Sequence, residues 1–143
     1  MVTTDFNIPR VMAAFHGRID KAMEVIGAQA VSWAADRLRA NGYSEHTPPP
    51  PKGRTGNLNN SIAWSTDKKQ SKPKTESSLP LAQEQLTTHI GSMAAYAARV
   101  EFGFVGKDSL GRVFNQKQKS YLRAGIYTKR RQIESIIQRA LSA

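Results

Sequence analysis

AAYAARVEFGF, residues 94–104, combines helix-forming alanines with aromatic and charged side chains. Tyr96 and Val100 are four residues apart and would share one face of a helix. Gly103 is suited to end that helix, because glycine readily adopts the left-handed backbone conformation common at helix C-termini. The stretch therefore predicts a short helix near residues 94–102, whose end carries the aromatic and charged groups.

Glu101 and Phe102 lie at the predicted helix end. A carboxylate among apolar side chains needs a cationic partner, and we expect Arg123 or Arg54 to pair with Glu101. Two interpretations stay open at this point. The cluster is either a cap that closes the core of the subunit or an anchor whose aromatic side chains contact a neighbouring chain.

Two segments upstream of this cluster alternate apolar and polar residues, as half-buried strands do. They are NSIAWST, residues 60–66, and LTTHIGS, residues 86–92, and we expect them to pair as a hairpin. The intervening residues 67–85 are rich in Lys, Ser, Gln and Pro. Because such a composition cannot offset its ordering entropy by burial, residues 67–85 are predicted to form a flexible arm.

Helices are predicted at both ends of the chain. From Pro9 to Asn41 apolar residues recur every three to five positions, with proline suited to the first turn and Asn41-Gly42 suited to a C-terminal cap. A second amphipathic pattern follows Tyr121. We expect an α+β fold in which the N-terminal and C-terminal helices pack on a small antiparallel sheet with long mobile loops.

The length of 143 residues fits a single domain spanning residues 1–143. The formal net charge is +10, and residues 99–143 hold ten basic and three acidic side chains. Residues 105–120 form a second basic, glycine-containing loop in this interpretation. Such a charge favours contact with nucleic acid, an anionic surface or an acidic protein, although a merely solvated basic face explains it too.

Several classes of function find little support in the sequence. The chain has no cysteine, and its three histidines are widely spaced, so no metal or cofactor site is predicted. No nucleophile motif or paired carboxylates indicate an enzyme. GRTGNLNN, residues 53–60, lacks the spacing of a phosphate-binding loop. The N-terminus lacks the pattern of a signal peptide and no apolar run could cross a membrane, so a soluble protein is expected.

Three segments in this order resemble a known family: GRTGNLNNSI (53–62), IGSMAAYAARVEFGF (90–104) and SYLRAGI (120–126). The chain resembles the neck and tail-component proteins of tailed double-stranded DNA phages. That family shows a T-G-x-L-x-x-S-I turn and strand, a Y-A-x-x-V-E-F-G helix end and an F-L-R-P-A-L start of the last helix. Tyr121 stands where phenylalanine is usual, and Gly125 follows Ala124 where the family has leucine.

The resemblance implies a structural virion protein that forms a ring, expected to be a hexamer, at the head–tail junction or tail end as a neck, tail-completion or tail-terminator component. It would be made in the host cytoplasm. Its expected partners are copies of itself, head-closure or connector proteins and tail proteins, and neither catalysis nor membrane binding is expected. The residues that the resemblance marks as structural or interface positions are Arg54, Thr55, Gly56, Leu58, Tyr96, Glu101, Phe102, Gly103, Tyr121, Leu122 and Arg123.

The alternative of another class is a basic nucleic-acid-binding module, because lysine and arginine release counterions from phosphates on binding. An enzyme has the least support. In either of the first two cases a set of basic side chains is expected to face acidic partner proteins or DNA, including DNA in the channel of a ring. This set comprises Arg112, Lys117, Lys119, Lys129, Arg130 and Arg131.

Overall fold

The computed structural model describes residues 7–41, 57–107 and 109–142. Its helices and strands confirm the predicted α+β class. The predicted cap at Gly42 and the motif residues Arg54, Thr55 and Gly56 lie outside the described residues.

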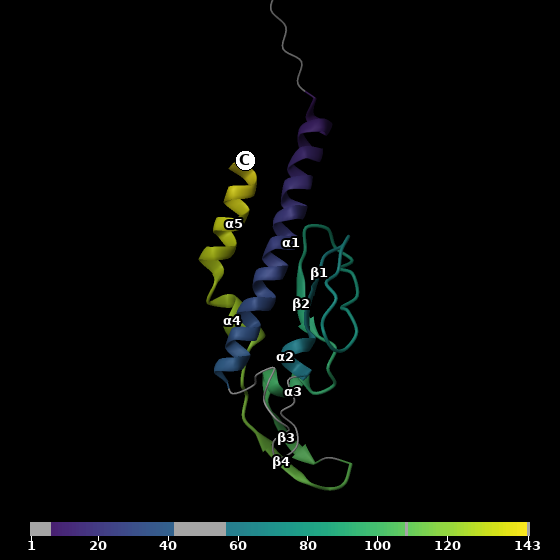
Figure 1. Cartoon of the computed structure of the whole chain (residues 1–143), viewed down its shortest axis with the longest axis vertical. Helices are drawn as coiled ribbons and strands as arrows, with labels where there is room; N and C mark the ends of the chain where they lie inside the picture. Colours follow the sequence, from purple (N-terminus) through teal and green to yellow (C-terminus); the bar gives the residue numbers. More distant parts are fainter. Residues whose placement is uncertain (1–6, 42–56, 108, 143) are drawn as a thin grey trace, which may run out of the picture.

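Helix α1 spans Ile8–Ala40 and confirms the long N-terminal helix (Figure 1). It begins after Asn7, whose side-chain oxygen accepts a hydrogen bond from the Arg10 N–H at 3.1 Å. Pro9 lies in the first turn, where its missing N–H removes no intrahelical bond. The sequence signals at this end therefore act as expected.

The buried stripe of α1 repeats every four residues. It consists of Ala22, Ile26, Ala30, Ala34 and Leu38. The earlier turns extend past the sheet (Figure 1), and Phe15, one of the recurring apolar residues of this helix, is exposed.

Strands β1 (Ile62–Ser65) and β2 (His89–Ser92) pair antiparallel, which confirms the predicted hairpin. The short helix α2 (Asn57–Ser61) leads into β1. The sheet packs on α1, and Gly27 lies at this contact. A Cβ atom on Gly27 would stand 2.8 Å from the Trp64 side chain, so glycine permits the close approach of helix and strand.

Residues 67–85 fold back on the sheet. The Ser71 N–H donates to the Trp64 carbonyl at 2.9 Å, and the side chains of Leu79 and Ala82 are buried. Leu79 and Ala82 are two of the few apolar residues in a segment whose composition otherwise predicts little burial. The flexibility of residues 67–85 in an isolated subunit stays a prediction.

Two lysines tie the same segment to α1. Lys68 pairs with Asp20, and Lys69 Nζ lies 3.2 Å from a carboxylate oxygen of Glu24. The hydrogen bond with Asp20 raises the pKa of Lys68. Both acidic side chains of this part of α1 are thus engaged on the sheet side of the helix.

Residues 105–120, expected to be a loop, contain most of a second hairpin. Strand β3 (Phe104–Lys107) pairs antiparallel with β4 (Val113–Gln116). Gly111, with φ 76°, lies in the connecting turn and adopts a conformation that other residues rarely take. The hairpin forms one end of the molecule (Figure 1).

The predicted last helix is divided into α4 (Leu122–Tyr127) and α5 (Arg130–Ser142). The Thr128 hydroxyl between them donates to the Ala124 carbonyl at 2.9 Å. Bonds of this kind compete with the helical ladder and often accompany bends. No proline or glycine marks this break, which explains why the periodicity suggested one helix.

Helices α4 and α5 pack on α1, which lies between α5 and the β1–β2 sheet (Figure 1). The expectation that both terminal helices lie on the sheet is therefore corrected for the C-terminal one. A Cβ atom on Gly125 would lie 3.1 Å from the Trp33 carbonyl oxygen, so this glycine brings the α4 backbone close to α1.

The principal core lies where α1, α2, β1, α3 (Ala97–Phe102) and the start of α4 meet. Its buried side chains are Ala34, Leu38, Leu58, Ile62, Ala94, Ala97, Val100 and Tyr121. The helix predicted near residues 94–102 is thus present, slightly shorter, and directed into this core.

Candidate functional site

The Glu101 side chain lies in the last turn of α3 and is only 3% exposed. Gly103 follows at the C-cap with φ 79° and ψ 173°, a conformation that favours glycine. This turn directs the chain out of α3 and into β3. The placement of Glu101 and Gly103 therefore links the core to the second hairpin.

The Glu101 carboxylate caps helix α4. It accepts hydrogen bonds from the backbone N–H groups of Tyr121 at 2.8 Å, Leu122 at 3.0 Å and Arg123 at 3.1 Å. The Ser120 hydroxyl donates to the same carboxylate at 2.9 Å. The first N–H groups of a helix have no intrahelical partner, so one side chain satisfies donors that would otherwise be unpaired.

The predicted ion pair of Glu101 with Arg123 is confirmed, with Nε 2.9 Å from Oε1. Arg54, the other expected partner, lies outside the described residues. The Arg123 guanidinium also stacks over the Phe102 ring, 4.5 Å from its centroid. Arg123 therefore joins the buried carboxylate to an aromatic ring that is 62% exposed.

Two opposing effects set the pKa of Glu101. Burial raises it, but the N–H groups of Leu122, Tyr121 and Arg123, together with the Arg123 side chain, lower it more strongly, to about 2. The carboxylate is ionised at neutral pH and surrounded by donors. It is suited to hold α3 and α4 together.

Tyr121, expected at an interface or structural position, is fully buried in the core of its own subunit. Burial, and then the negative charge of Glu101, raises the pKa of its phenol. The hydroxyls of Tyr121 and Tyr96 have no hydrogen-bond partner among the described residues. Leu58 is fully buried and Leu122 packs against the same core, so these motif residues stabilise the subunit itself.

The predicted basic residues do not form one cluster. Arg112 and Lys117 are exposed on or beside the β3–β4 hairpin, whereas Arg130 and Arg131 begin α5. Arg130 pairs with Glu134 at 3.2 Å.

Two further predicted lysines are partly buried. Lys119 Nζ donates to the Asn41 carbonyl at 3.4 Å and the Lys119 backbone N–H to the Val100 carbonyl at 2.9 Å, so this residue fastens the end of the hairpin segment. Lys129 lies at the α4–α5 junction.

The second hairpin carries three exposed apolar residues that were not predicted from the sequence. Val105 is 78% exposed, Leu110 76% and Val113 73%. Val105 and Val113 lie on the same face of the hairpin, because Val113 pairs with Lys107, which is two residues from Val105 in β3. Lys107 and Asn115 share this face, so it is mixed in character. The β-branched and aromatic residues Val105, Val113 and Phe114 favour strands, but the lysines and glycines of the segment obscured this signal.

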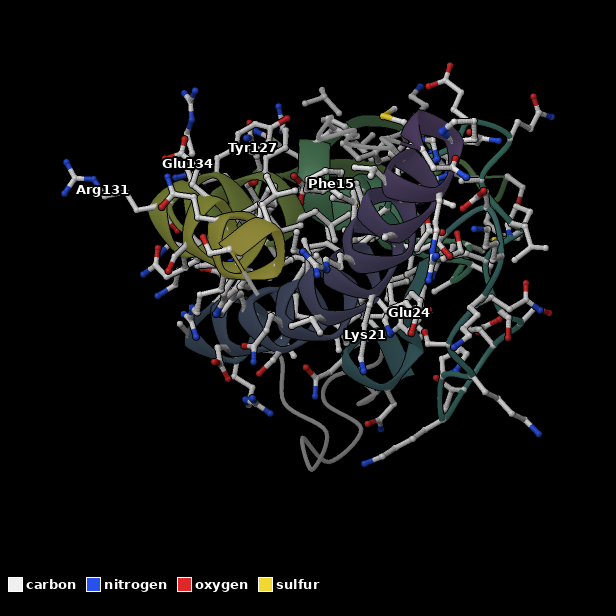
Figure 2. All side chains as sticks on the ribbon, turned by 90° about the horizontal axis from the view of Figure 1, so that it is seen from above. Phe15, Lys21, Glu24, Tyr127, Arg131 and Glu134 are labelled. Atoms are coloured by element: carbon white, nitrogen blue, oxygen red, sulfur yellow. The ribbon has the colours of Figure 1, made fainter. Side chains whose placement is uncertain are left out.

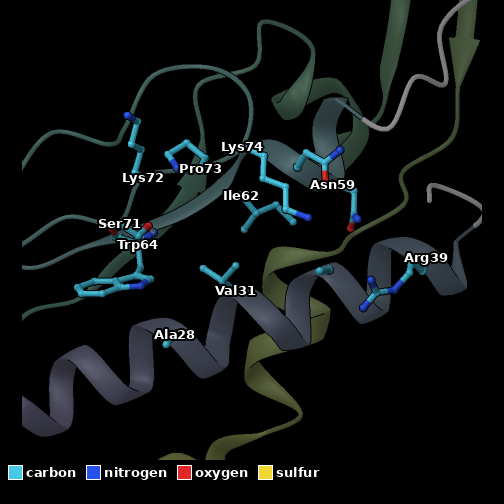
Figure 3. A pocket seen from close by; sticks show the side chains of 12 residues that line it. Ala28, Val31, Arg39, Asn59, Ile62, Trp64, Ser71, Lys72, Pro73 and Lys74 are labelled. Carbon is cyan, nitrogen blue, oxygen red and sulfur yellow. Dashed lines mark hydrogen bonds between the residues drawn. The ribbon is translucent and has the colours of Figure 1, made fainter. Parts of the chain in front are cut away.

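A separate pocket of about 370 Å³ lies between α1, β1 and residues 71–74 (Figure 3). Val31, Ile62 and Trp64 provide apolar walls, and Lys74 extends across the opening toward Asn59. Asn59 is buried, and its Oδ1 atom has no partner among the described residues. The mixed lining gives no single ligand chemistry.

Within the described ranges, no group of three His, Asp or Glu side chains is arranged to hold a metal ion. None of the helices in the same ranges combines the length and apolar character needed to span a membrane. Comparison with known proteins found no matching family model, no matching curated protein and no matching solved structure.

Proposed function

We propose that this chain is a structural subunit of a tailed double-stranded DNA phage and assembles into a ring at the head–tail junction or tail end. The observation that carries the proposal is the exposure of three large apolar side chains, Val105, Leu110 and Val113, on the β3–β4 hairpin. An isolated two-stranded hairpin is marginally stable in water, and exposed apolar patches mark interaction sites. The resemblance in sequence pattern to neck and tail-component proteins supports the same conclusion.

The Glu101 cluster supports this function indirectly. The contact joins the two ends of the hairpin segment, because Glu101 precedes β3 and its carboxylate accepts hydrogen bonds from Ser120 to Arg123, which follow β4. The hairpin is thus fixed at its base while Val105 and Val113 remain exposed on one of its faces. The cluster closes the core, as its first interpretation expects, and under this proposal the hairpin beside it would be covered by a neighbouring subunit.

The test measures the mass of the purified chain by light scattering and its shape by electron microscopy. Rings are expected from the unchanged chain, and Val105→Asp/Val113→Asp should shift assembly to at least about tenfold higher protein concentration, because central apolar contacts carry most interface energy. Leu81→Asp/Leu86→Asp is the matched control, since both leucines are exposed apolar residues outside the hairpin and the charge change is equal. Rings of unchanged mass from the hairpin variant would contradict the assigned interface.

The alternative, a basic nucleic-acid-binding module, is favoured by one observation: Lys117 and Arg131 are exposed in a chain of net charge +10. This alternative predicts a monomer that binds duplex DNA with strong salt dependence. A monomer at all concentrations, with DNA affinity lost in Arg112→Glu/Lys117→Glu, would replace the ring proposal with this one.

A further inference from the structure

Helix α5 is strongly amphipathic, yet none of its residues is buried. Ile133, Ile136 and Ile137 are half-buried, and Leu141 is exposed. The helix packs on α1 at the end where α1 extends past the sheet (Figure 1). Two helices alone cannot enclose an apolar stripe, so this part of the molecule has an incomplete helical layer.

A groove runs along one side of the α1–α5 pair. Its two adjoining hollows, of about 270 and 500 Å³, share the side chains of Val25 and Ile136. Ala22 and Ala140 line the first hollow and Trp33 the second. The first hollow is therefore largely apolar, whereas Gln29, Gln132 and Ser135 add polar groups to the second. Val25, which both hollows share, is 43% exposed.

The margins of the groove are basic. Its lining includes Arg18, Lys21, Arg131 and Arg139, and no acidic side chain among the described residues. Figure 2 shows Lys21 on the opposite side of the helices from Phe15 and Tyr127. The nearby acids of α1 cannot neutralise the groove effectively, because Asp20 and Glu24 pair with Lys68 and Lys69 on the sheet side.

We propose that the α1–α5 groove binds an acidic amphipathic helix of another protein. An apolar stripe on that helix would cover Val25 and Ile136, and flanking carboxylates would meet the arginines and Lys21. A second copy of the same groove would bring cations against cations. The DNA backbone would leave the apolar floor uncovered, so the combination of floor and margin favours an acidic helix.

The test uses the full chain and a synthetic peptide. With 13 residues, α5 is about 20 Å long at 1.5 Å per residue, so a peptide of about 18 residues spans it. The peptide carries leucines in a helical stripe flanked by glutamates, and its comparison is a scrambled peptide of identical composition. Calorimetry should give at least about tenfold tighter binding for the striped peptide, because only it can place apolar and acidic groups together.

Two pairs of variants locate the binding. Arg18→Glu/Lys21→Glu should weaken it about tenfold or more, whereas Lys72→Glu/Lys107→Glu, an equal charge change outside the groove, should change it less than about threefold. Val25→Asn should weaken binding more than Leu81→Asn, since both residues are exposed but only Val25 lines the groove. Circular dichroism confirms that each variant is folded.

Equal binding of the two peptides, or equal losses in the two charge variants, would mean only general attraction to a basic protein and would overturn the proposal. Duplex DNA or anionic phosphatidylglycerol vesicles that displace the striped peptide from the groove would overturn it in favour of those ligands. The measurement does not depend on ring formation. A chain that binds the peptide but never forms rings would contradict the proposed function and leave this inference standing.

Discussion

Replacing Glu101 tests the link between the core and the second hairpin. In Glu101→Gln the side chain keeps its shape but loses its charge, and its amide N–H₂ faces the donors of Tyr121, Leu122 and Arg123. The pKa of Glu101 falls from an ordinary 4.5 to about 2 in the folded state, which corresponds to about 3 kcal/mol favouring the folded, ionised form. Glu101→Ala should cost about 3–5 kcal/mol, as loss of one partner of a buried ion pair usually does.

Urea unfolding measures this loss directly. With a denaturant slope of about 1–3 kcal/mol per M, a loss of about 3 kcal/mol lowers the urea midpoint by about 1–3 M. Glu84→Gln is the matched control, because Glu84 is exposed and its replacement should change stability by no more than about 0.5 kcal/mol. Equal midpoints for Glu101→Gln and Glu84→Gln would refute the reasoning that the buried carboxylate holds α3 and α4 together.

Three further predictions concern stability and exchange. The stabilisation from Glu101 should be present above pH about 4.5 and lost as the pH falls toward 2, because the pKa of Glu101 is depressed in the folded state. In Glu101→Gln, the free energy of unfolding measured in urea should therefore depend less on pH over this range. Gly27→Ala should destabilise the chain by about 1–3 kcal/mol, because the added Cβ would lie too close to the Trp64 side chain. Gly17→Ala, with open space around the added Cβ, should stabilise the chain by about 0.5–1 kcal/mol. Equal thermal midpoints of the two variants would contradict the close helix–strand contact. Hydrogen exchange in the isolated subunit should be faster for residues 67–85 than for β1, with protection increasing on assembly; unchanged exchange would dispose of the flexible arm.

The elements that the sequence predicts well are those with local signals. The periodicity of α1, with Pro9 near its start, and the alternation in β1 and β2 require no knowledge of the rest of the chain. Glu101 could be assigned an arginine partner because a carboxylate among aromatic residues needs a cation.

The remaining features depend on contacts between distant segments. The pairing of Lys68 with Asp20 joins residues 48 positions apart, and no local pattern indicates it. The role of Gly125 appears only where α4 approaches Trp33, and the exposure of Val105 follows from the lack of a covering element in the described subunit. Tyr121 was recognised as a motif residue, but only the packing places it inside the core.

Both ends of the β3–β4 hairpin are attached near one carboxylate. Changes in the hairpin during evolution can therefore occur independently of changes in the core. The hairpin segment, Phe102 to Ser120, begins and ends beside Glu101, whose carboxylate binds Ser120 and Arg123. The packing of the core therefore does not require a fixed length for this segment. Doubling a flexible loop costs only about 0.6 kcal/mol in closure entropy. Insertions, deletions and substitutions near Gly111 could therefore adapt this protein to different neighbours while the helices and the first sheet stay unaltered.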